Sequence, residues 1–337
     1  MMRIDAYTHF IPKKLFEKLV ESGHADIGKR MRSVPSIHDL DIRNKVVDGF
    51  PDYAQILSYP MPPLEALAGP DRVEDYCKIV NDGFAEICAR DPARYPGWVG
   101  QTSLAAPDAG VREAERAIRN GALGVQIYTN INGKPLDRPE FAPFFAAMNR
   151  IGKPIWLHPV RTAKHPDYLD EPKSKYEIWW AFGWSYETAA AMARLVFSKT
   201  LDTCPDLKLI VHHFGGIAPM LEGRIGPGWD QIGARTSDED LDALRRSLKK
   251  RPLDYFKQNF HADTATFGGR GAALCGFDFF PLDHVVFASD CPFDPEKGPG
   301  YIRETMKIID AMDFTPAQRA MIYHGNLEKL TGVRLVK

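Results

Sequence analysis

The chain of 337 residues has the length of one large α/β barrel domain, and its content of 44% hydrophobic and 26% charged residues suits a protein with a large buried core. With 43 Lys and Arg against 44 Asp and Glu, the formal net charge is -1, which excludes the broad cationic surface of a general nucleic-acid binder. No apolar run has the length of a membrane-spanning helix, and the five cysteines are widely spaced, so we expect a cytoplasmic protein without membrane or nucleic-acid partners.

Eight short β-rich runs recur along the chain, and they are Arg3–Phe10, Tyr53–Tyr59, Trp98–Leu104, Leu123–Thr129, Pro154–His158, Leu207–His213, Tyr255–Asp263 and His284–Asp290. Segments with helical periodicity lie between them, such as Asp71–Arg90, Ala109–Asn120, Pro139–Ile151 and Ser185–Thr203. This alternation predicts parallel strands joined by helical crossovers. Eight such units favour a closed (β/α)8 barrel over an open doubly wound sheet, whose first strand is ordinarily followed by a Gly-rich phosphate loop.

Two segments are longer than a barrel requires, namely Pro12–Asp52 after the first strand and Val160–Trp184 after the fifth. Long segments at the carboxyl ends of barrel strands usually form lids, substrate contacts or oligomer arms. We therefore predict a distorted TIM barrel with inserted loops or helices after strands 1 and 5. The sequence has no internal repeat or flexible linker, so we expect residues 1–337 to form one domain.

Polar side chains gather where the predicted strands end, and they are Tyr7, His9, His158, His213, His261, Asp263 and Asp290. The carboxyl ends of barrel strands converge on one rim, where barrel active sites form. Imidazole and carboxylate groups together are natural ligands for zinc or manganese. A single histidine at a strand end more often has a structural role, so the prediction depends on the convergence. His212 precedes His213 and should point to the other side of the strand, so we assign it a structural role.

The residues around His158 favour a flat, anionic substrate. Arg161 follows His158 closely enough to reach a carboxylate, and Arg224 and Arg235 are further candidates. Aromatic residues can form the walls of a pocket, namely Trp156, Trp179, Trp180, Phe182 and Trp184. The same tryptophans could equally pack in the core or at a dimer interface, and Arg224 could be a structural ion-pair partner.

Several short motifs follow one another in a characteristic order. They are ID-x-Y-x-H at Ile4–His9, GVQIYTNINGKPL at Gly124–Leu136, H-P at His158–Pro159, HHFGGIAPMLEGRI at His212–Ile225, ASDCPF at Ala288–Phe293 and HGNLEKLTGV at His324–Val333. In order and spacing they resemble the amidohydrolase superfamily, in the amidohydrolase-2 branch around aminocarboxymuconate semialdehyde decarboxylase and γ-resorcylate decarboxylase. The resemblance extends over nearly the whole chain.

The resemblance implies a metal-dependent, non-oxidative decarboxylase of an aromatic or muconate-like unsaturated carboxylic acid. It implies one divalent ion, zinc before manganese, held by His9, His158 and Asp290. His213 and Asp290 would then be the catalytic residues, and Arg161 and Trp180 would contact the substrate. A hydrolase or hydratase that uses metal-bound water on a related carboxylate is the alternative. We also expect a homodimer, as is common for barrels of this family.

Tyr7 departs from the family pattern, in which the first strand carries HxH, or ExH in resorcylate-type members. A neutral phenol is a poor ligand, because its ordinary pKa is about 10. Three outcomes are open: Tyr7 binds as phenolate, the metal keeps only His9, His158 and Asp290, or no metal binds. We expect the second outcome, with Tyr7 as a hydrogen-bond donor beside the ion and in contact with the substrate.

Overall fold

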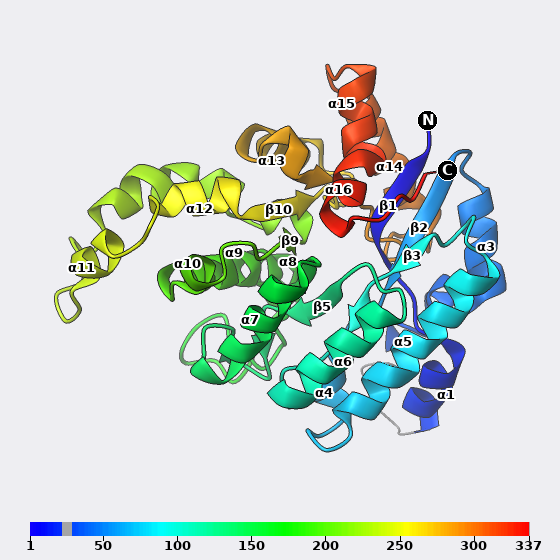
Figure 1. The fold of residues 1–337 in the computed structure, drawn as a ribbon, viewed down its shortest axis with the longest axis horizontal. Coiled ribbons are helices and arrows are strands. Elements are labelled where there is room, and N and C mark those ends of the chain that lie inside the picture. The colour runs from blue at the N-terminus through cyan, green and yellow to red at the C-terminus, as the bar shows by residue number, and fades with distance from the viewer. Residues whose placement is uncertain (22–28, 337) are drawn as a thin grey trace.

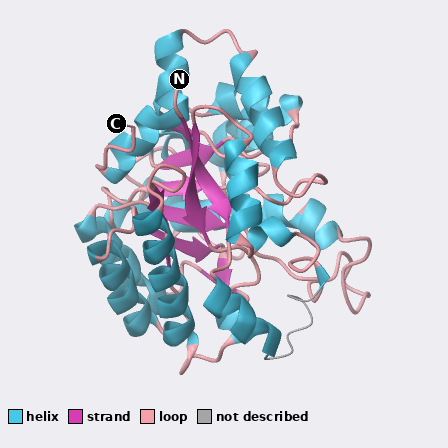
Figure 2. Ribbon diagram, turned by 90° about the vertical axis from the view of Figure 1, so that its right-hand side faces the viewer, coloured by secondary structure: helices cyan, strands magenta, loops and turns pink. Residues whose placement is uncertain are grey.

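The computed structural model describes residues 1–21 and 29–336, and short parallel strands occupy its centre (Figures 1 and 2). These strands are β1 (Arg3–His9), β2 (Tyr53–Ser58), β3 (Gly97–Trp98), β4 (Gly100–Gln101), β5 (Val125–Tyr128), β8 (Ile155–His158), β9 (Leu209–Val211), β10 (Phe260–Asp263) and β11 (Val285–Val286). A separate antiparallel hairpin consists of β6 (Asn130–Ile131) and β7 (Lys134–Pro135).

The central strands pair in the order of a closed eight-stranded barrel. One series runs β1, β2, β3, and a second runs β4, β5, β8, β9, β10, β11, with parallel pairing throughout. Val99 joins β3 and β4, which together make one barrel strand. The barrel closes where the amide of Ala6 donates to the carbonyl of Phe287 and the amide of His9 to that of Cys291, both at 2.8 Å. The predicted (β/α)8 barrel is confirmed.

Helices surround these strands (Figure 2). The α-helices are α1 (Lys13–Glu21), α3 (Leu40–Asp48), α4 (Leu64–Leu67), α5 (Val73–Arg90), α6 (Pro107–Arg119), α7 (Ala142–Ile151), α8 (Ile178–Ala181), α9 (Gly183–Phe197), α10 (Thr200–Thr203), α11 (Leu241–Arg246), α12 (Pro252–Gln258), α13 (Arg270–Phe279), α14 (Pro299–Asp310), α15 (Pro316–Ala320) and α16 (Asn326–Thr331). Short 3₁₀ or π turns are η1 (Pro35–Ile37), η2 (Pro139–Phe141), η3 (His213–Gly215), η4 (Pro219–Leu221), η5 (Arg224–Gly228), η6 (Trp229–Gln231), η7 (Leu282–His284) and η8 (Met321–Gly325).

The seventh strand is shorter than the predicted run Tyr255–Asp263. Its first part belongs to α12, and β10 begins only at Phe260. Pro252 occupies the first helical turn, where its fixed φ favours a helix. Tyr255 and Phe256 are buried on that helix rather than in the barrel wall.

Apolar side chains fill the barrel and the space between its strands and the helices. The interior cluster contains small and branched residues from nearly every strand, including Ala6, Ile56, Ile210 and Ala288. Trp156 is fully buried in this interior, and its indole nitrogen donates to the carbonyl of Ala6 at 3.2 Å. Trp156 is therefore part of the core rather than a pocket wall.

The predicted insert after the first strand contains α1 and α3, and Arg43 on α3 contacts residues at the barrel rim. The guanidinium of Arg43 is fully buried and donates to the carbonyl of Ser36 at 2.8 Å and to Gln55 Oε1 at 3.2 Å. It also donates to the carbonyl of His9 and to Cys291 Sγ. Through Arg43, this insert therefore holds the end of β1 and the segment after β11.

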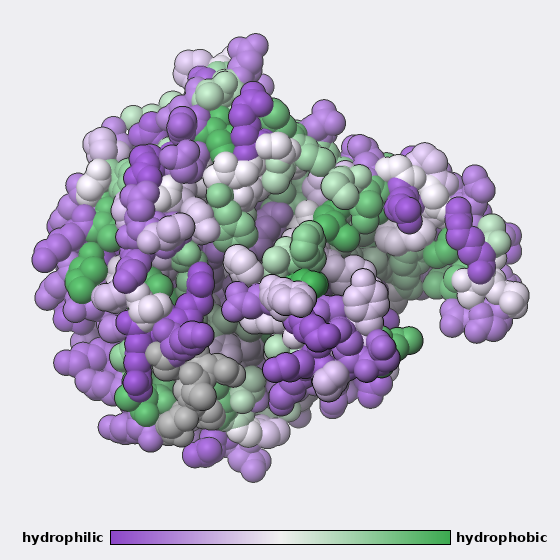
Figure 3. Space-filling view, turned by 180° about the vertical axis from the view of Figure 1, so that it is seen from behind, coloured by the Kyte–Doolittle hydropathy of each residue, from purple (hydrophilic) through white to green (hydrophobic). Residues whose placement is uncertain are grey.

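The polypeptide between η5 and α12 forms an extension that the sequence pattern did not indicate. Its tip, around α11, projects from the barrel (Figures 1 and 3). The face seen in Figure 3 is mostly hydrophilic, with separate hydrophobic patches. Within the described part of the chain, no helix is both long and apolar enough to cross a membrane.

Candidate metal centre

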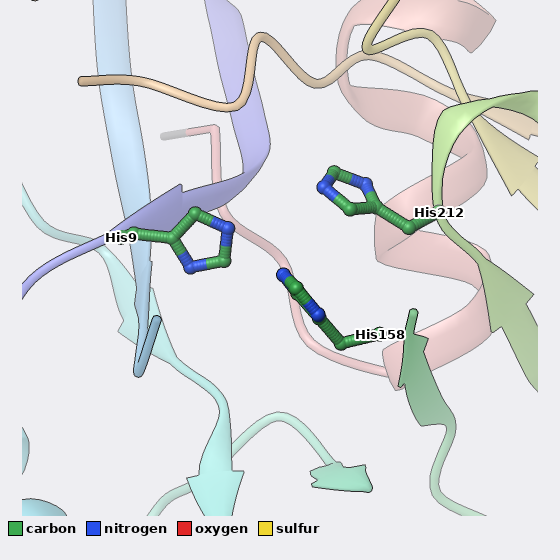
Figure 4. A group of neighbouring side chains, drawn as sticks. All are labelled: His9, His158 and His212. Carbon is green, nitrogen blue, oxygen red and sulfur yellow. The ribbon is translucent and has the colours of Figure 1, made fainter. Parts of the chain in front are cut away.

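Five side chains from four barrel strands meet at the carboxyl-terminal rim: His9 at the end of β1, His158 at the end of β8, His212 and His213 directly after β9, and Asp290 shortly after β11. Figure 4 shows the rings of His9, His158 and His212 around one common space. One ligand atom from each of these three lies within 4.8 Å of the others, and the same holds for His212, His213 and Asp290. All except the half-buried His213 are buried.

His9 and His158 present Nε2 to this space because their Nδ1 atoms are engaged. His9 Nδ1 lies 3.0 Å from Ser58 Oγ, and that hydroxyl donates its own proton to the carbonyl of Thr8 at 3.0 Å. The hydroxyl therefore accepts from Nδ1. His158 Nδ1 lies 2.7 Å from the carbonyl of Pro159, which can only accept. In both rings Nε2 then carries the lone pair that a metal ion needs.

The Nδ1 atoms of His212 and His213 also have hydrogen-bond acceptors. His212 Nδ1 lies 2.5 Å from Asp263 Oδ2, and His213 Nδ1 lies 2.7 Å from the carbonyl of Ala265. Asp263 Oδ1 also accepts from the amides of His213 at 3.0 Å and Ala265 at 3.1 Å, so this carboxylate is held in place. In the neutral form of both rings, the proton therefore lies on Nδ1 and Nε2 carries the lone pair.

The alternation argument assigned His212 to the wrong face. Ile210 faces the barrel interior, so strand alternation also carries His212 to the inner side. β9 ends at Val211, and the backbone of His213 has a φ of 56°. This left-handed conformation lies outside strand geometry, and the ring of His213 stacks on that of His212 at 3.6 Å. Both imidazoles therefore belong to the site.

The first strand contains a β-bulge next to the site. Asp5 pairs with Gln55 but Thr8 pairs with Leu57, so β1 has one more residue than β2 between these pairs. Bulges re-aim side chains and are frequent beside active sites. Here Tyr7 joins the barrel interior, and the following histidine still reaches the rim.

Tyr7 directs its hydroxyl toward Gln126 on β5. The phenol is fully buried and donates to Gln126 Oε1 at 2.7 Å. Burial and the nearby carboxylates of Asp263 and Asp290 raise the pKa of Tyr7 well above its usual value, which keeps the phenol neutral. Its ring packs edge-on against His212 at 4.5 Å. The geometry is that of a hydrogen-bond donor, as expected, but the acceptor is Gln126.

Charge at the rim is concentrated on Asp290 and His212. Burial raises the pKa of Asp290, but contacts from His212 and His9 outweigh it and hold this pKa below its usual range. Burial lowers the pKa of His212, but Asp263 and Asp290 outweigh it and raise this pKa to about 9. Burial lowers the pKa of His9 and His158, so these rings are neutral. The carboxylates of Asp263 and Asp290 therefore favour a positive charge at this position, which a bound divalent ion would supply in place of a second proton on His212.

Aromatic residues of the second insert border the same rim. The ring of Trp184 lies 5.5 Å from that of His158. The ring of Trp180 lies 6.2 Å from Phe267, which in turn lies 4.8 Å from His213. Trp180 is about one-third exposed, so these rings form an accessible apolar border beside His158 and His213.

The predicted arginines either pair with another side chain or are exposed. Arg161 forms an ion pair with Glu187 at 2.9 Å, and its carbonyl accepts from the indole of Trp184. Arg224 is exposed at the start of η5, and Arg235 is exposed beyond it.

His261 lies near the start of its strand instead of at its end, because β10 begins at Phe260. Its ring stacks at 4.2 Å on His284, which precedes β11. Asp263, at the other end of β10, reaches the rim and contacts His212. The shorter strand thus separates these two candidates.

A second polar group, which we call the tyrosine side, consists of Tyr59, Glu65, Gln126 and Tyr128. It lies at β2, β5 and α4, and β2 and β5 are the direct neighbours of the strands that carry His9 and His158. Gln126 donates to the carbonyl of Tyr59 at 3.0 Å and to Tyr128 at 3.1 Å. Among the described residues, the buried Tyr59 hydroxyl has no hydrogen-bond partner, and the carboxylate of Glu65 is buried beside it. Burial raises the pKa of Glu65 to about 7. We call the cluster of His9, His158, His212, His213, Asp263 and Asp290 the histidine side.

Comparisons with known proteins show the family and the fold of this chain. A family model described as amidohydrolase matches residues 4–332. The 2-amino-3-carboxymuconate-6-semialdehyde decarboxylase of Dictyostelium discoideum is 27% identical over 98% of this chain and 92% of its own length. The γ-resorcylate decarboxylase of Rhodococcus jostii is 29% identical over 86% of each chain. The structure of 5-carboxyvanillate decarboxylase from Novosphingobium aromaticivorans, with manganese and 4-hydroxy-3-methoxy-5-nitrobenzoic acid, has a TM-score of 0.84 at 23% identity and covers 98% of this chain and 96% of that one.

Proposed function

This chain belongs to the amidohydrolase family, and on that premise we propose that it is a metal-dependent, non-oxidative decarboxylase of an aromatic or muconate-like carboxylic acid. The observation that carries the proposal is the histidine side, a set of imidazole and carboxylate donors at the barrel rim. Its relatives are named as decarboxylases of such acids. We also propose that residues 1–337 act as one catalytic domain, since the family match spans nearly all of them.

We assign His9, His158 and Asp290 as ligands of one divalent ion. The residues fit such an ion: His9 Nε2 lies 2.9 Å from Asp290 Oδ1 without hydrogen-bond geometry, so a buried lone pair faces a buried carboxylate. A cation between them would remove this repulsion. Zinc is our first choice, because imidazole-rich sites suit it, and manganese, which the carboxyvanillate enzyme holds, is the second.

When bound, the ion would anchor the substrate carboxylate with a neighbouring oxygen and withdraw electron density from the ring. Loss of CO2 leaves an electron pair on carbon, and that carbon needs a proton. The low pKa of Asp290 favours a ligand role over that of proton carrier, which leaves His213 to deliver the proton from Nε2. Burial and the charge of His212 lower the pKa of His213 to about 4, and an anionic substrate beside it would raise that pKa again.

Substrate contacts are assigned to Tyr7, Arg161, Trp180 and Arg224, as the sequence suggested. The position of Trp180 beside Phe267 supports its role as a pocket wall. Arg161 would have to exchange its ion pair with Glu187 for a substrate carboxylate.

We also propose a homodimer whose contact includes the second insert. The support is a group of strongly exposed apolar side chains in and beside that insert: Tyr168, Leu169, Tyr176 and Phe182. The five unpaired cysteines favour a reducing, cytoplasmic location.

Assays for CO2 release and metal content test the function. Purified protein is incubated with a panel of 2-hydroxybenzoic and muconate-type acids. The variant His158→Ala should lose bound metal and at least about 1,000-fold in kcat/KM, equivalent to about 4 kcal/mol. The variant His324→Gln, whose ring contacts Glu328 instead of the cluster, should keep both. Turnover without CO2 would indicate the hydrolase or hydratase alternative, and full activity in His158→Ala would refute the metal site.

A further inference from the structure

The two donor positions on the first strand are unequal in this chain. His9 presents a lone pair to the rim, whereas the hydroxyl of Tyr7 donates its proton to Gln126 Oε1 at 2.7 Å. Without help, the proposed ion would therefore have two imidazoles and one carboxylate. A fourth protein ligand would complete the tetrahedral coordination that zinc prefers.

His212 lies where such a ligand is needed. Its ligand atom is within 4.8 Å of those of both His9 and His158, and its Nε2 lies 3.4 Å from Asp290 Oδ1. Figure 4 shows the three rings turned toward the same space. We propose that His212 is the fourth protein ligand of the metal ion and replaces the donor that Tyr7 does not supply. This inference rests on the proposed function, because it deepens the metal site assigned there.

Asp263 prepares His212 for this role. Its Oδ2 accepts from His212 Nδ1 at 2.5 Å, which fixes the proton on Nδ1 and leaves Nε2 as the donor atom. Its Oδ1 accepts two backbone amides, so the carboxylate cannot rotate away. A carboxylate behind an imidazole is the usual support of a metal-bound histidine.

The packing around His212 argues against a direct contact with substrate. His212 is fully buried, with the ring of His213 stacked on it and the ring of Tyr7 against its edge. His213 is only half-buried and borders Phe267 and the aromatic insert. The geometry thus divides the two neighbouring histidines: His212 binds the ion and His213 faces the substrate.

Zinc X-ray absorption on the unmodified protein tests this directly. Binding through His9, His158 and His212 gives three imidazole scatterers, whereas the site proposed above without His212 gives two. A count of two overturns the inference and leaves the proposed function intact. This measurement needs no variant, so a folding defect cannot obscure it.

Zinc affinity of variants provides the second test. Apo-protein prepared with a chelator is titrated with zinc against a competing indicator, and folding is checked by circular dichroism. His212→Gln should weaken zinc binding at least about 100-fold, and Asp263→Asn about 10- to 100-fold. Tyr7→Phe and the control His324→Gln should stay within about threefold of the unmodified protein, because the inference gives neither a ligand role.

Two results separate the inference from the proposed function. Zinc binding that is unchanged in His212→Gln but lost in His158→Ala refutes the fourth ligand alone. Zinc binding that is unchanged in both variants refutes the metal site itself. A large loss of zinc affinity in Tyr7→Phe would also overturn the inference, because it would show that Tyr7 on the first strand is itself a ligand.

Discussion

The two sides of the barrel rim are built from different chemistry. On the histidine side, every imidazole has a defined Nδ1 acceptor, and charge is concentrated on Asp290 and His212. On the tyrosine side, phenols and a glutamine bind one another and backbone carbonyls, and the carboxyl group of Glu65 is buried beside them. One side is thus prepared for a cation and an anionic substrate, and the other for neutral groups.

The largest effect should come from His213 on the histidine side. His213→Asn removes the proposed proton donor, and we expect kcat to fall about 100- to 10,000-fold. Bound zinc should remain at the level of the unmodified protein, since His213 is not assigned as a ligand. Parallel measurements of kcat and metal content check this. A variant that loses zinc with its activity would show that His213 belongs to the coordination sphere, and the division between the two histidines would fail.

The next effect concerns Glu65 on the tyrosine side. Burial raises its pKa from 4.5 to about 7, so the folded protein holds this proton more tightly than the unfolded chain does. The free energy of unfolding that depends on Glu65 is therefore highest below pH 4.5, where the carboxyl group is protonated in both states. It falls as the pH rises from 4.5 to about 7, because burial opposes ionisation in the folded protein. Glu65→Gln should raise the free energy of unfolding by up to about 3 kcal/mol at pH 8.

Urea unfolding at two pH values checks this difference. The gain from Glu65→Gln should be small at pH 5, where the wild-type carboxyl is mostly protonated. An equal gain at both pH values would mean that packing around residue 65, and not its charge, determines the change in the free energy of unfolding.

The smallest effect should come from the aromatic border of the histidine side. Trp180→Ala removes a partly exposed ring next to Phe267, and we expect KM to rise several-fold, about 1 kcal/mol, with little change in kcat. Lys173→Ala, which truncates an exposed side chain of the same insert, serves as the control and should change neither constant. Steady-state kinetics on the best substrate distinguish the two. Equal behaviour of both variants would place the substrate away from the insert.

The barrel and much of its rim could be predicted from the sequence. The alternation of β-rich runs with helical segments gave the eight strands, because a buried parallel strand has a distinctive apolar composition. His9, His158 and Asp290 were found because each lies at or just beyond a strand end, where the topology alone brings them together. Their positions depend on no side-chain detail.

Features that depend on local backbone geometry were not predicted. The bulge in β1 sets the positions of Tyr7 and His9. A single inserted residue cannot be recognised in the hydrophobic pattern of one sequence. His212 was missed because the alternation was counted from His213, whose positive φ takes it out of strand geometry. Counting from the buried Ile210 would have placed His212 inside.

Arg43 gives the first insert a consequence for protein engineering. Because its guanidinium holds the carbonyl of His9 and the sulfur of Cys291, the segment between the first two strands is part of the foundation of the rim. Swapping this segment for that of a relative, in order to change specificity, would remove the support of a residue assigned to the ion. Chimeras intended to alter substrate choice should therefore exchange the second insert and retain α3.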